Sequence, residues 1–320
     1  MPRELVVLGT ASQAPTKRRN HNGYLLRWDA ATLLFDPGEG TQRQLALAGL
    51  SAASVDRICI THAHGDHTLG LPGVLARREL DLAGNPVPPV ILHFPAAAQP
   101  DVEILRHAGS PWGALPAVEQ PVDPTTADEG GLVRVATTPE WTLFAAALDH
   151  SVPDIGYRLE EPAGRTMIPE LLARYGISGP DVGTLIEEGY LRVAGQTVHV
   201  DEVSRPRPGQ VFALIMDTRQ APGILPLAHG ADLLVIESTF LEADAELADA
   251  YRHLTAAQAG REARRAGVRR LVLTHFSRRY GDSAEPFVSE AAAEFGGVPG
   301  EDVVGAEDLQ HIVVPPREDV

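Results

Sequence analysis

Short apolar runs rich in Val, Ile and Leu alternate along the chain with longer stretches in which apolar residues recur at helical spacing. Buried strands give the first pattern and amphipathic helices give the second. The apolar runs predict strands at Glu4–Leu8, Tyr24–Trp28, Leu33–Asp36, Arg57–Thr61, Val90–Phe94, Leu143–Leu148, Ile155–Leu159, Val211–Met216, Leu233–Glu237 and Leu271–Thr274. The helical spacing predicts helices at Thr41–Ala48, Thr68–Leu82, Ala256–Ala266 and Glu285–Phe295. This mixture of hairpin-like and strand–helix connections favours an α/β sandwich over a simple parallel sheet.

Two stretches interrupt the alternation. Leu115–Gly131 is rich in Pro, Asp and Gly, so we expect a surface loop there. Glu160–Gln210 is longer and irregular, with Gly179-Pro180 near its middle. We interpret this second stretch, residues 160–210, as an arm inserted into one domain that spans residues 1–320, and not as a separate domain.

Four side chains that bind metals well follow the predicted strand Arg57–Thr61, and they are His62, His64, Asp66 and His67. Imidazole and carboxylate groups suit Zn²⁺. His62 and His64 are two residues apart and can project the same way as the chain leaves the strand, whereas Asp66 and His67 fall in the next turn. One short loop can thus serve two metal ions about 3.5–4 Å apart, which can bridge a hydroxide. A solvated polar loop is the alternative, but apolar residues flank the cluster on both sides.

The loop alone cannot complete two zinc sites, so further ligands must come from elsewhere in the chain. Three candidates each end or follow a predicted strand, and they are His150, Asp217 and His275. The ends of strands are where an α/β sheet exposes functional side chains. Together with the loop, these residues predict two Zn²⁺ ions per chain.

The cluster His62–His67 resembles the H-x-H-x-D-H signature of the metallo-β-lactamase superfamily, and the wider sequence is similar to bacterial ribonuclease Z, the short form of the tRNA 3′-processing endonuclease. Beyond the signature, the similarity runs in family order through Leu8-Gly9-Thr10 with Pro15-Thr16 and Arg19-Asn20, Phe35–Gln42, Leu148–His150 with Gly156–Arg158, Asp217–Arg219, His253–Ala259, and Leu273–Ser277 with Arg279-Tyr280. The resemblance implies an αββα sandwich with an inserted flexible arm.

The resemblance also implies roles for the candidates. One zinc ion would be held by His62, His64 and His150 and the other by Asp66, His67 and His275, with Asp217 bridging the two. Asp66 would act as general base, and His253 would give a proton to the leaving 3′ oxygen. The activity implied is cleavage of the 3′ trailer from precursor tRNA by a metal-bridging hydroxide, leaving a 3′-hydroxyl on the tRNA. A homodimer and an arm that clamps tRNA are implied in the same way.

Several residues are candidates for binding the substrate. Arg279 follows the predicted ligand His275 within one turn, so we expect it to contact substrate phosphate. Arg19 is a second candidate, for which a solvated loop is an equally good explanation. Gly179 and Pro180 of the arm are matched to the segment that binds tRNA in the family.

Three carboxylates are candidates for holding the ligating imidazoles in place. Asp36, Glu39 and Glu237 lie near or at the ends of predicted strands, where they can accept hydrogen bonds from ligand histidines. Capping of the predicted helix Thr41–Ala48 is an alternative explanation of Asp36 and Glu39.

The net charge of −16 argues against a protein coated with basic surface for nucleic acid. It leaves room for a small basic patch, because charges beyond a Debye length of about 8 Å are screened. The arm contradicts the family pattern more directly, since Glu160–Gln210 contains eight acidic residues and five arginines, a net charge of −3. Such an arm is poor at binding phosphates.

The acidic arm therefore keeps a rival enzyme open, a dizinc phosphodiesterase or arylsulfatase that acts on a small ester. A non-catalytic RNA-binding homologue is less well supported, because such a protein should have lost metal ligands. A β-lactamase or thiolesterase disagrees with the carboxylate at Asp217 and with the segment around His253.

The sequence also bears on where the protein acts. Nothing in the first thirty residues resembles a signal peptide. No apolar run reaches the roughly 18 residues that span a bilayer. Cys59 is the only cysteine, so no intramolecular disulfide can form. We expect a cytoplasmic protein without membrane contact.

Overall fold

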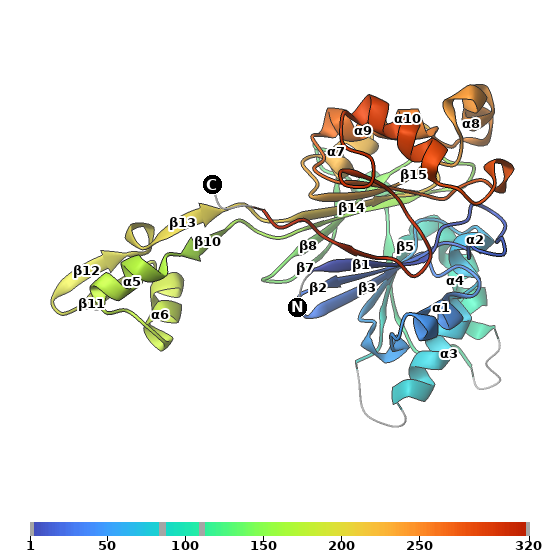
Figure 1. The fold of residues 1–320 in the computed structure, drawn as a ribbon. Helices are drawn as coiled ribbons and strands as arrows, with labels where there is room; N and C mark the ends of the chain where they lie inside the picture. The colour runs from blue at the N-terminus through green and yellow to red at the C-terminus, as the bar shows by residue number, and fades with distance from the viewer. Residues whose placement is uncertain (1–2, 83–87, 109–112, 318–320) are drawn as a thin grey trace. The chain divides into compact units, whose positions relative to one another are not determined.

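The computed structural model describes residues 3–82, 88–108 and 113–317 (Figure 1). The chain divides into two compact units. The larger contains Met1–Leu159 and Val211–Pro315, and the smaller is built mainly from Glu160–Gln210. None of the helices in the described ranges is both long and apolar enough to span a lipid bilayer.

The first sheet of the larger unit has seven strands in the order β18-β1-β2-β3-β4-β5-β6. Their bounds are β1 Glu4–Gly9, β2 Gly23–Trp28, β3 Ala31–Phe35, β4 Arg57–Cys59, β5 Ile91–Pro95, β6 Val118–Val122 and β18 His311–Val313. Neighbours are antiparallel from β18 to β3 and parallel from β3 to β6. The helices α1 (Thr41–Leu47), α3 (Leu71–Leu82) and α4 (Gln99–His107) lie together on the outer side of this sheet (Figure 1).

The second sheet also has seven strands, in the order β17-β16-β15-β14-β9-β8-β7. Their bounds are β7 Val133–Thr137, β8 Thr142–Ala147, β9 Ile155–Glu160, β14 Val211–Ile215, β15 Leu233–Glu237, β16 Leu271–Thr274 and β17 Val303–Gly305. The strands β14 to β17 are parallel. The helices α7 (Ile224–Ala228), α9 (Ala256–Ala266) and α10 (Glu285–Phe295) cover its outer side (Figure 1).

The main core lies between the two sheets. Side chains alternate along a strand, so Leu5 and Val7 of β1 point into this core, whereas Val6 and Leu8 point out to the helices. Large aromatic side chains fill the middle, with the ring of Phe35 5.7 Å from that of Phe212 across the sheets. The architecture is therefore helix, sheet, sheet, helix, and the predicted αββα sandwich is confirmed.

Most predicted elements match within one or two residues, and four match at both ends: Leu233–Glu237, Leu271–Thr274, Ala256–Ala266 and Glu285–Phe295. The helix expected from Thr68 begins at Leu71, because the short helix α2 (Gly65–Thr68) precedes it. The prediction of a loop at Leu115–Gly131 was wrong in part, because this stretch contains the strand β6. This strand lies at the edge of its sheet, where Pro121 costs no ladder hydrogen bond and most side chains are exposed.

The smaller unit is more regular than its sequence indicates. The strand β10 (Gly164–Met167) pairs antiparallel with β13 (Ser204–Arg207), and β11 (Tyr190–Val193) forms a hairpin with β12 (Gln196–His199). The helices are α5 (Pro169–Tyr175) and α6 (Pro180–Glu188). A small core unites these elements through Leu172, Ile177, Leu185, Val198 and Val203. Strands of four residues are too short to show a clear period, which is why the sequence suggested an irregular segment.

Two kinds of short element complete the chain. The helix α8 (Ala245–Tyr251) lies between β15 and α9 in the sequence. Single 3₁₀ turns occupy Ala52–Ser54, Ala96–Ala98, Pro124–Thr126, Val200–Glu202, Glu242–Asp244 and Arg278–Tyr280.

Candidate metal centre

The predicted ligands meet where strands of both sheets end. The cluster His62–His67 follows β4 of the first sheet, whereas Asp217 and His275 follow β14 and β16 of the second. His150 lies in the connection between β8 and β9. Asp217 and His275 have positive φ angles of 41° and 61°, a backbone conformation that costs free energy for residues other than glycine. Such strained residues concentrate at functional sites.

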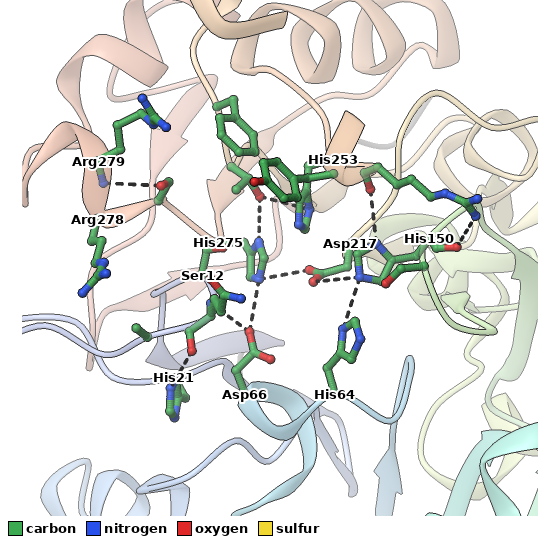
Figure 2. Close-up of a pocket in the computed structure, with 18 of the residues that line it drawn as sticks. Ser12, His21, His64, Asp66, His150, Asp217, His253, His275, Arg278 and Arg279 are labelled. Carbon is green, nitrogen blue, oxygen red and sulfur yellow. Dashed lines mark hydrogen bonds and ion pairs between the residues drawn. The ribbon is translucent and has the colours of Figure 1, made fainter. Parts of the chain in front are cut away.

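One group of four ligand atoms comes from His62, His64, His150 and Asp217. The Nδ1 atom of His64 lies 3.0 Å from Nε2 of His62 and 3.2 Å from Nε2 of His150. The Oδ2 atom of Asp217 is 3.7 Å from His62 Nε2 and 3.8 Å from His150 Nε2. Figure 2 shows His64, His150 and Asp217 pointing toward one another.

The second group shares Asp217 and adds Asp66, His67 and His275. The Oδ2 atom of Asp66 is 3.5 Å from Nε2 of His67 and 3.6 Å from Nε2 of His275. Asp217 Oδ2 is 3.4 Å from His67 Nε2, and Asp217 Oδ1 is 3.1 Å from His275 Nε2. A tetrahedral site with bonds of about 2.0–2.2 Å has edges of roughly 3.4 Å, so both groups have the size that a zinc ion requires.

The protonation states suit metal ligands as well. Burial lowers the pKa of His62, His64 and His150, which keeps their imidazoles neutral. Burial opposes ionisation of Asp66, but His67 and His275 outweigh it and lower the pKa of the carboxyl group. Neutral imidazole and ionised carboxylate are the forms that bind metals.

The carboxylates of the centre favour positive charge beside them. Burial lowers the pKa of His67, yet Asp217 and Asp66 outweigh burial and raise it well above its usual value. Two buried atoms that face each other, Asp217 Oδ1 and His275 Nε2, have no hydrogen-bond partner among the residues that the structure describes. Divalent ions would supply this positive charge and the missing partners, so the residues present fit a dinuclear metal site.

One buried carboxylate on each sheet supports two imidazoles. Asp36 Oδ2 accepts from His67 Nδ1 at 2.9 Å and from the Thr61 hydroxyl at 2.9 Å, and Thr61 Oγ1 in turn lies 3.0 Å from His62 Nδ1. This support holds the Nδ1 side of each ring and turns Nε2 toward the other candidate ligands, as an outer hydrogen bond to a ligand imidazole does.

On the second sheet, Glu237 supports two imidazoles in the same way as Asp36 does on the first. Its Oε1 accepts from His253 Nδ1 at 2.9 Å, and its Oε2 accepts from the Thr239 hydroxyl at 2.6 Å. The Thr239 hydroxyl oxygen lies 2.7 Å from His275 Nδ1. Burial lowers the pKa of His253, but the Glu237 carboxylate outweighs it and raises this pKa to about 9.

Two of the predicted site residues lie elsewhere. Glu39 is exposed and 3.9 Å from His21, so it supports no ligand, and helix α1 begins without a side-chain cap. Arg19 is buried, and its guanidinium donates to Thr10 Oγ1 and to the carbonyls of Ala306 and Asp282. A buried guanidinium whose two Nη atoms donate inside the fold is not available to substrate phosphate, so the expectation for Arg19 was wrong.

The remaining candidates are placed as follows. Arg279 is exposed and lines the cavity of about 780 Å³ that also contains His64, Asp66, His150, Asp217, His253 and His275. In Figure 2, Arg278 and Arg279 lie on one side of His275, and Asp217 and His150 lie on the other. Gly179 and Pro180 belong to the smaller unit, where Gly179 has a φ of 58° and Pro180 begins α6.

Sequence reasoning missed one buried group at this centre. The carboxylate of Asp154 is buried, lies 3.7 Å from His62 Nδ1, and has no hydrogen-bond partner for either oxygen in the described residues. Burial and the neighbouring Asp217 raise its pKa well above the usual value. Its place in the connection after His150 was the only signal in the sequence, and burial cannot be read from that.

Comparison with known proteins identifies the family. The model of the metallo-β-lactamase superfamily matches residues 16–161. A ribonuclease Z of Nocardia farcinica is 52% identical over 315 residues, which cover 98% of this chain and 99% of that protein. The chain belongs to the ribonuclease Z family. A ribonuclease Z of Streptomyces coelicolor is 53% identical at the same coverage, and one of Chlamydia trachomatis is 40% identical over 92% of this chain and 94% of its own length.

Solved structures agree with this assignment at the level of the fold. Human tRNase Z, short form, superposes with a TM-score of 0.69 at 24% identity, covering 98% of this chain and 99% of that one. The predicted family and the predicted class of enzyme, a metal-dependent endoribonuclease of the ribonuclease Z type, are therefore confirmed.

Proposed function

We propose that this ribonuclease Z family member removes the 3′ trailer of precursor tRNA with two zinc ions and leaves a 3′-hydroxyl on the tRNA. The observation that carries the proposal is that residues of both four-atom ligand groups line one cavity together with His253, which is paired with the buried Glu237. The names of the relatives, ribonuclease Z and tRNase Z, support the substrate.

Two zinc ions bound here would supply a water of lowered pKa and neutralise charge on the phosphate. The chain itself fixes the proposed general base, because the backbone amide of Gln13 donates to Asp66 Oδ2 at 2.9 Å. Gln13 has a φ of 55°, the left-handed conformation that aims this amide at the carboxylate. Asp66 thus combines the roles of metal ligand and proton acceptor.

His253 is the proposed proton donor to the leaving 3′ oxygen. Its pKa of about 9 keeps the imidazole protonated at neutral pH. The hydrogen bond from Nδ1 to Glu237 fixes the ring, so Nε2 is the nitrogen that gives the proton. We further propose that Arg279, which is exposed and lines the same cavity, binds a phosphate next to the scissile bond.

The decisive experiment is a cleavage assay on precursor tRNA with a 3′ trailer, run beside a small phosphodiester and an aryl sulfate. We expect accurate cleavage of the RNA and a product that ends in a 3′-hydroxyl. Rapid turnover of a small ester, with no cleavage of any precursor tRNA, would favour the rival phosphodiesterase or arylsulfatase.

The metal content provides a second test. We expect protein purified without chelator to contain close to two zinc ions per chain, because seven ligands can complete two sites that share Asp217. Elemental analysis measures this directly. One ion or none after zinc addition would contradict the dinuclear centre.

The charge of the arm is the observation that favours the rival enzyme. The arm carries a net charge of −3, and two of its arginines are paired within it, Arg165 with Asp201 and Arg207 with Glu161. We propose that Glu160–Gln210 still contributes to tRNA binding, through backbone amides around Gly179-Pro180 and through arginines such as Arg192. Each phosphate contact contributes about −0.9 to the log–log salt slope, so a shallow slope is expected.

Deleting the arm should raise the Kd for precursor tRNA by about tenfold or more while it spares hydrolysis of a small phosphodiester. The amide of Glu161 donates to the carbonyl of Gln210 at 2.9 Å, so a short Gly/Ser linker can join the ends of the cut. Filter binding and a small-ester assay on both proteins measure the two effects. An unchanged Kd in a folded deletion would show that the arm does not bind tRNA.

We also propose a cytoplasmic homodimer, as the family resemblance implies. Light scattering at micromolar concentration should give twice the mass of the 34.2 kDa chain. A monomer under these conditions would contradict the proposal.

A further inference from the structure

The cavity of the metal centre has an apolar wall that the proposed chemistry does not use. The wall consists of Phe240, Leu247, Ala250 and Tyr251, all of which line the cavity. Leu247, Ala250 and Tyr251 lie three and four residues apart, so they share one face of α8. Tyr251 is 61% exposed, whereas Phe240 is only 6% exposed.

The two aromatic rings of this wall are parallel. The centroids of Phe240 and Tyr251 are 6.4 Å apart, with an angle of 6° between the ring planes. The ring of Phe240 also lies 6.0 Å from that of His253. Phe240 therefore contacts both Tyr251 and the proposed proton donor, while Tyr251 lines the cavity and keeps most of its surface exposed.

The residue that follows Tyr251 fixes the wall to the metal centre. Arg252 has a left-handed φ of 57°, which turns the chain between Tyr251 and His253. Its Nη1 donates to the carbonyl of His150 at 2.6 Å, and its own carbonyl lies 3.2 Å from Nδ1 of His150. The chain at Tyr251 is thus fixed next to a proposed metal ligand, as preorganised recognition requires.

The wall itself offers no charged group to a phosphate, because Phe240, Leu247, Ala250 and Tyr251 are all uncharged. The basic residues of the cavity lining are Arg252, Arg278 and Arg279. In Figure 2, Arg278 and Arg279 lie on the side of His275 away from Asp217 and His150. A nucleic acid in the cavity would therefore place its phosphates toward the arginines, and an uncharged planar group is what fits against Tyr251.

We propose that Phe240 and Tyr251 form a stacking site for one unpaired nucleobase beside the scissile phosphate. Proteins recognise single-stranded RNA by stacking its bases on aromatic side chains, with little dependence on the identity of the base. The proposal rests on the proposed function, because it takes the substrate to be RNA with unpaired nucleotides at the cleavage site. The stacking proposal names the side chain that would hold the base, Tyr251. It also names the wall of the cavity against which the base would lie.

The test combines protein variants with abasic substrates. Tyr251→Ala should raise KM for precursor tRNA by about 5- to 150-fold with a much smaller change in kcat. Tyr251→Phe keeps the ring and should recover most of this loss. Leu80→Ala, which removes a side chain 73% exposed on α3, is the control and should match the wild-type protein.

Abasic nucleotides are then placed one at a time on either side of the scissile phosphate. At the position whose base stacks, the abasic substrate should weaken the wild-type enzyme but add nothing to Tyr251→Ala. A change of less than twofold in KM for Tyr251→Ala, or full additivity at every position, would overturn the stacking site. Failure of the wild-type protein to cleave precursor tRNA would instead refute the proposed function.

Discussion

Replacing Asp66 by alanine is expected to lower the rate of precursor tRNA cleavage by more than about 10⁴-fold. The change removes a carboxylate that lies 3.5 Å from His67 Nε2 and 3.6 Å from His275 Nε2, the separation expected of ligands that share one ion, and it removes the proposed general base. It also leaves the amide of Gln13 without its acceptor. No other side chain of the second group combines these contributions.

Single-turnover kinetics, with elemental analysis of the same samples, measures the effect and separates its causes. Asp101→Ala is a matched control, because Asp101 is exposed in the first turn of α4 and should leave the rate unchanged. If Asp66→Ala cleaves at the wild-type rate, the proposed centre is wrong. If it retains two metals but loses activity, the proton-accepting role accounts for the loss.

The second large effect concerns the leaving group. His253→Ala should slow cleavage of precursor tRNA by about 10²–10⁴-fold, because a 3′ alkoxide leaves poorly without a proton. It should slow hydrolysis of a p-nitrophenyl phosphodiester far less, since nitrophenolate leaves without protonation. Glu237→Gln should show the same contrast to a smaller degree, because it removes the charge that raises the pKa of His253 and that orders its ring.

Rates on the two substrates, compared for each variant, provide the measurement. His107→Ala is the matched control, since this histidine is exposed at the end of α4. Equal losses on both substrates would show that His253 positions the substrate or supports the fold and does not donate the proton.

The sequence predicted the sandwich because its central strands are continuous apolar runs. Leu233–Glu237 and Leu271–Thr274 lie in the middle of a sheet and are buried along their whole length, so hydrophobicity alone marks their ends. The edge strand β6 lacks this signal, because its side chains are mostly exposed. The strands and helices of the smaller unit are too short to show a clear hydrophobic pattern.

The same reasoning explains which parts of the site could be predicted. Proposed metal ligands such as His150 and His275 are polar residues that follow apolar strands, a contrast that is visible in the sequence. Arg19 and Asp154 depend on tertiary packing, which the sequence does not show. The guanidinium of Arg19 is taken up by carbonyls from distant segments, and the importance of Asp154 lies in its burial against His62.

The candidate ligands come from segments far apart in the chain, so the two ligand groups are completed at different points of synthesis. The chain is made from its N-terminus, so the group of His62, His64, His150 and Asp217 is complete once β14 has been made and packed. The other group needs His275, which follows β16 and joins it only when that strand has paired with β15. The free energy of metal binding is available only to a chain in which the ligands have come together. In the proposed dinuclear centre, the first ion would therefore find its ligands before the chain is finished, and the second would favour the pairing of the C-terminal strands.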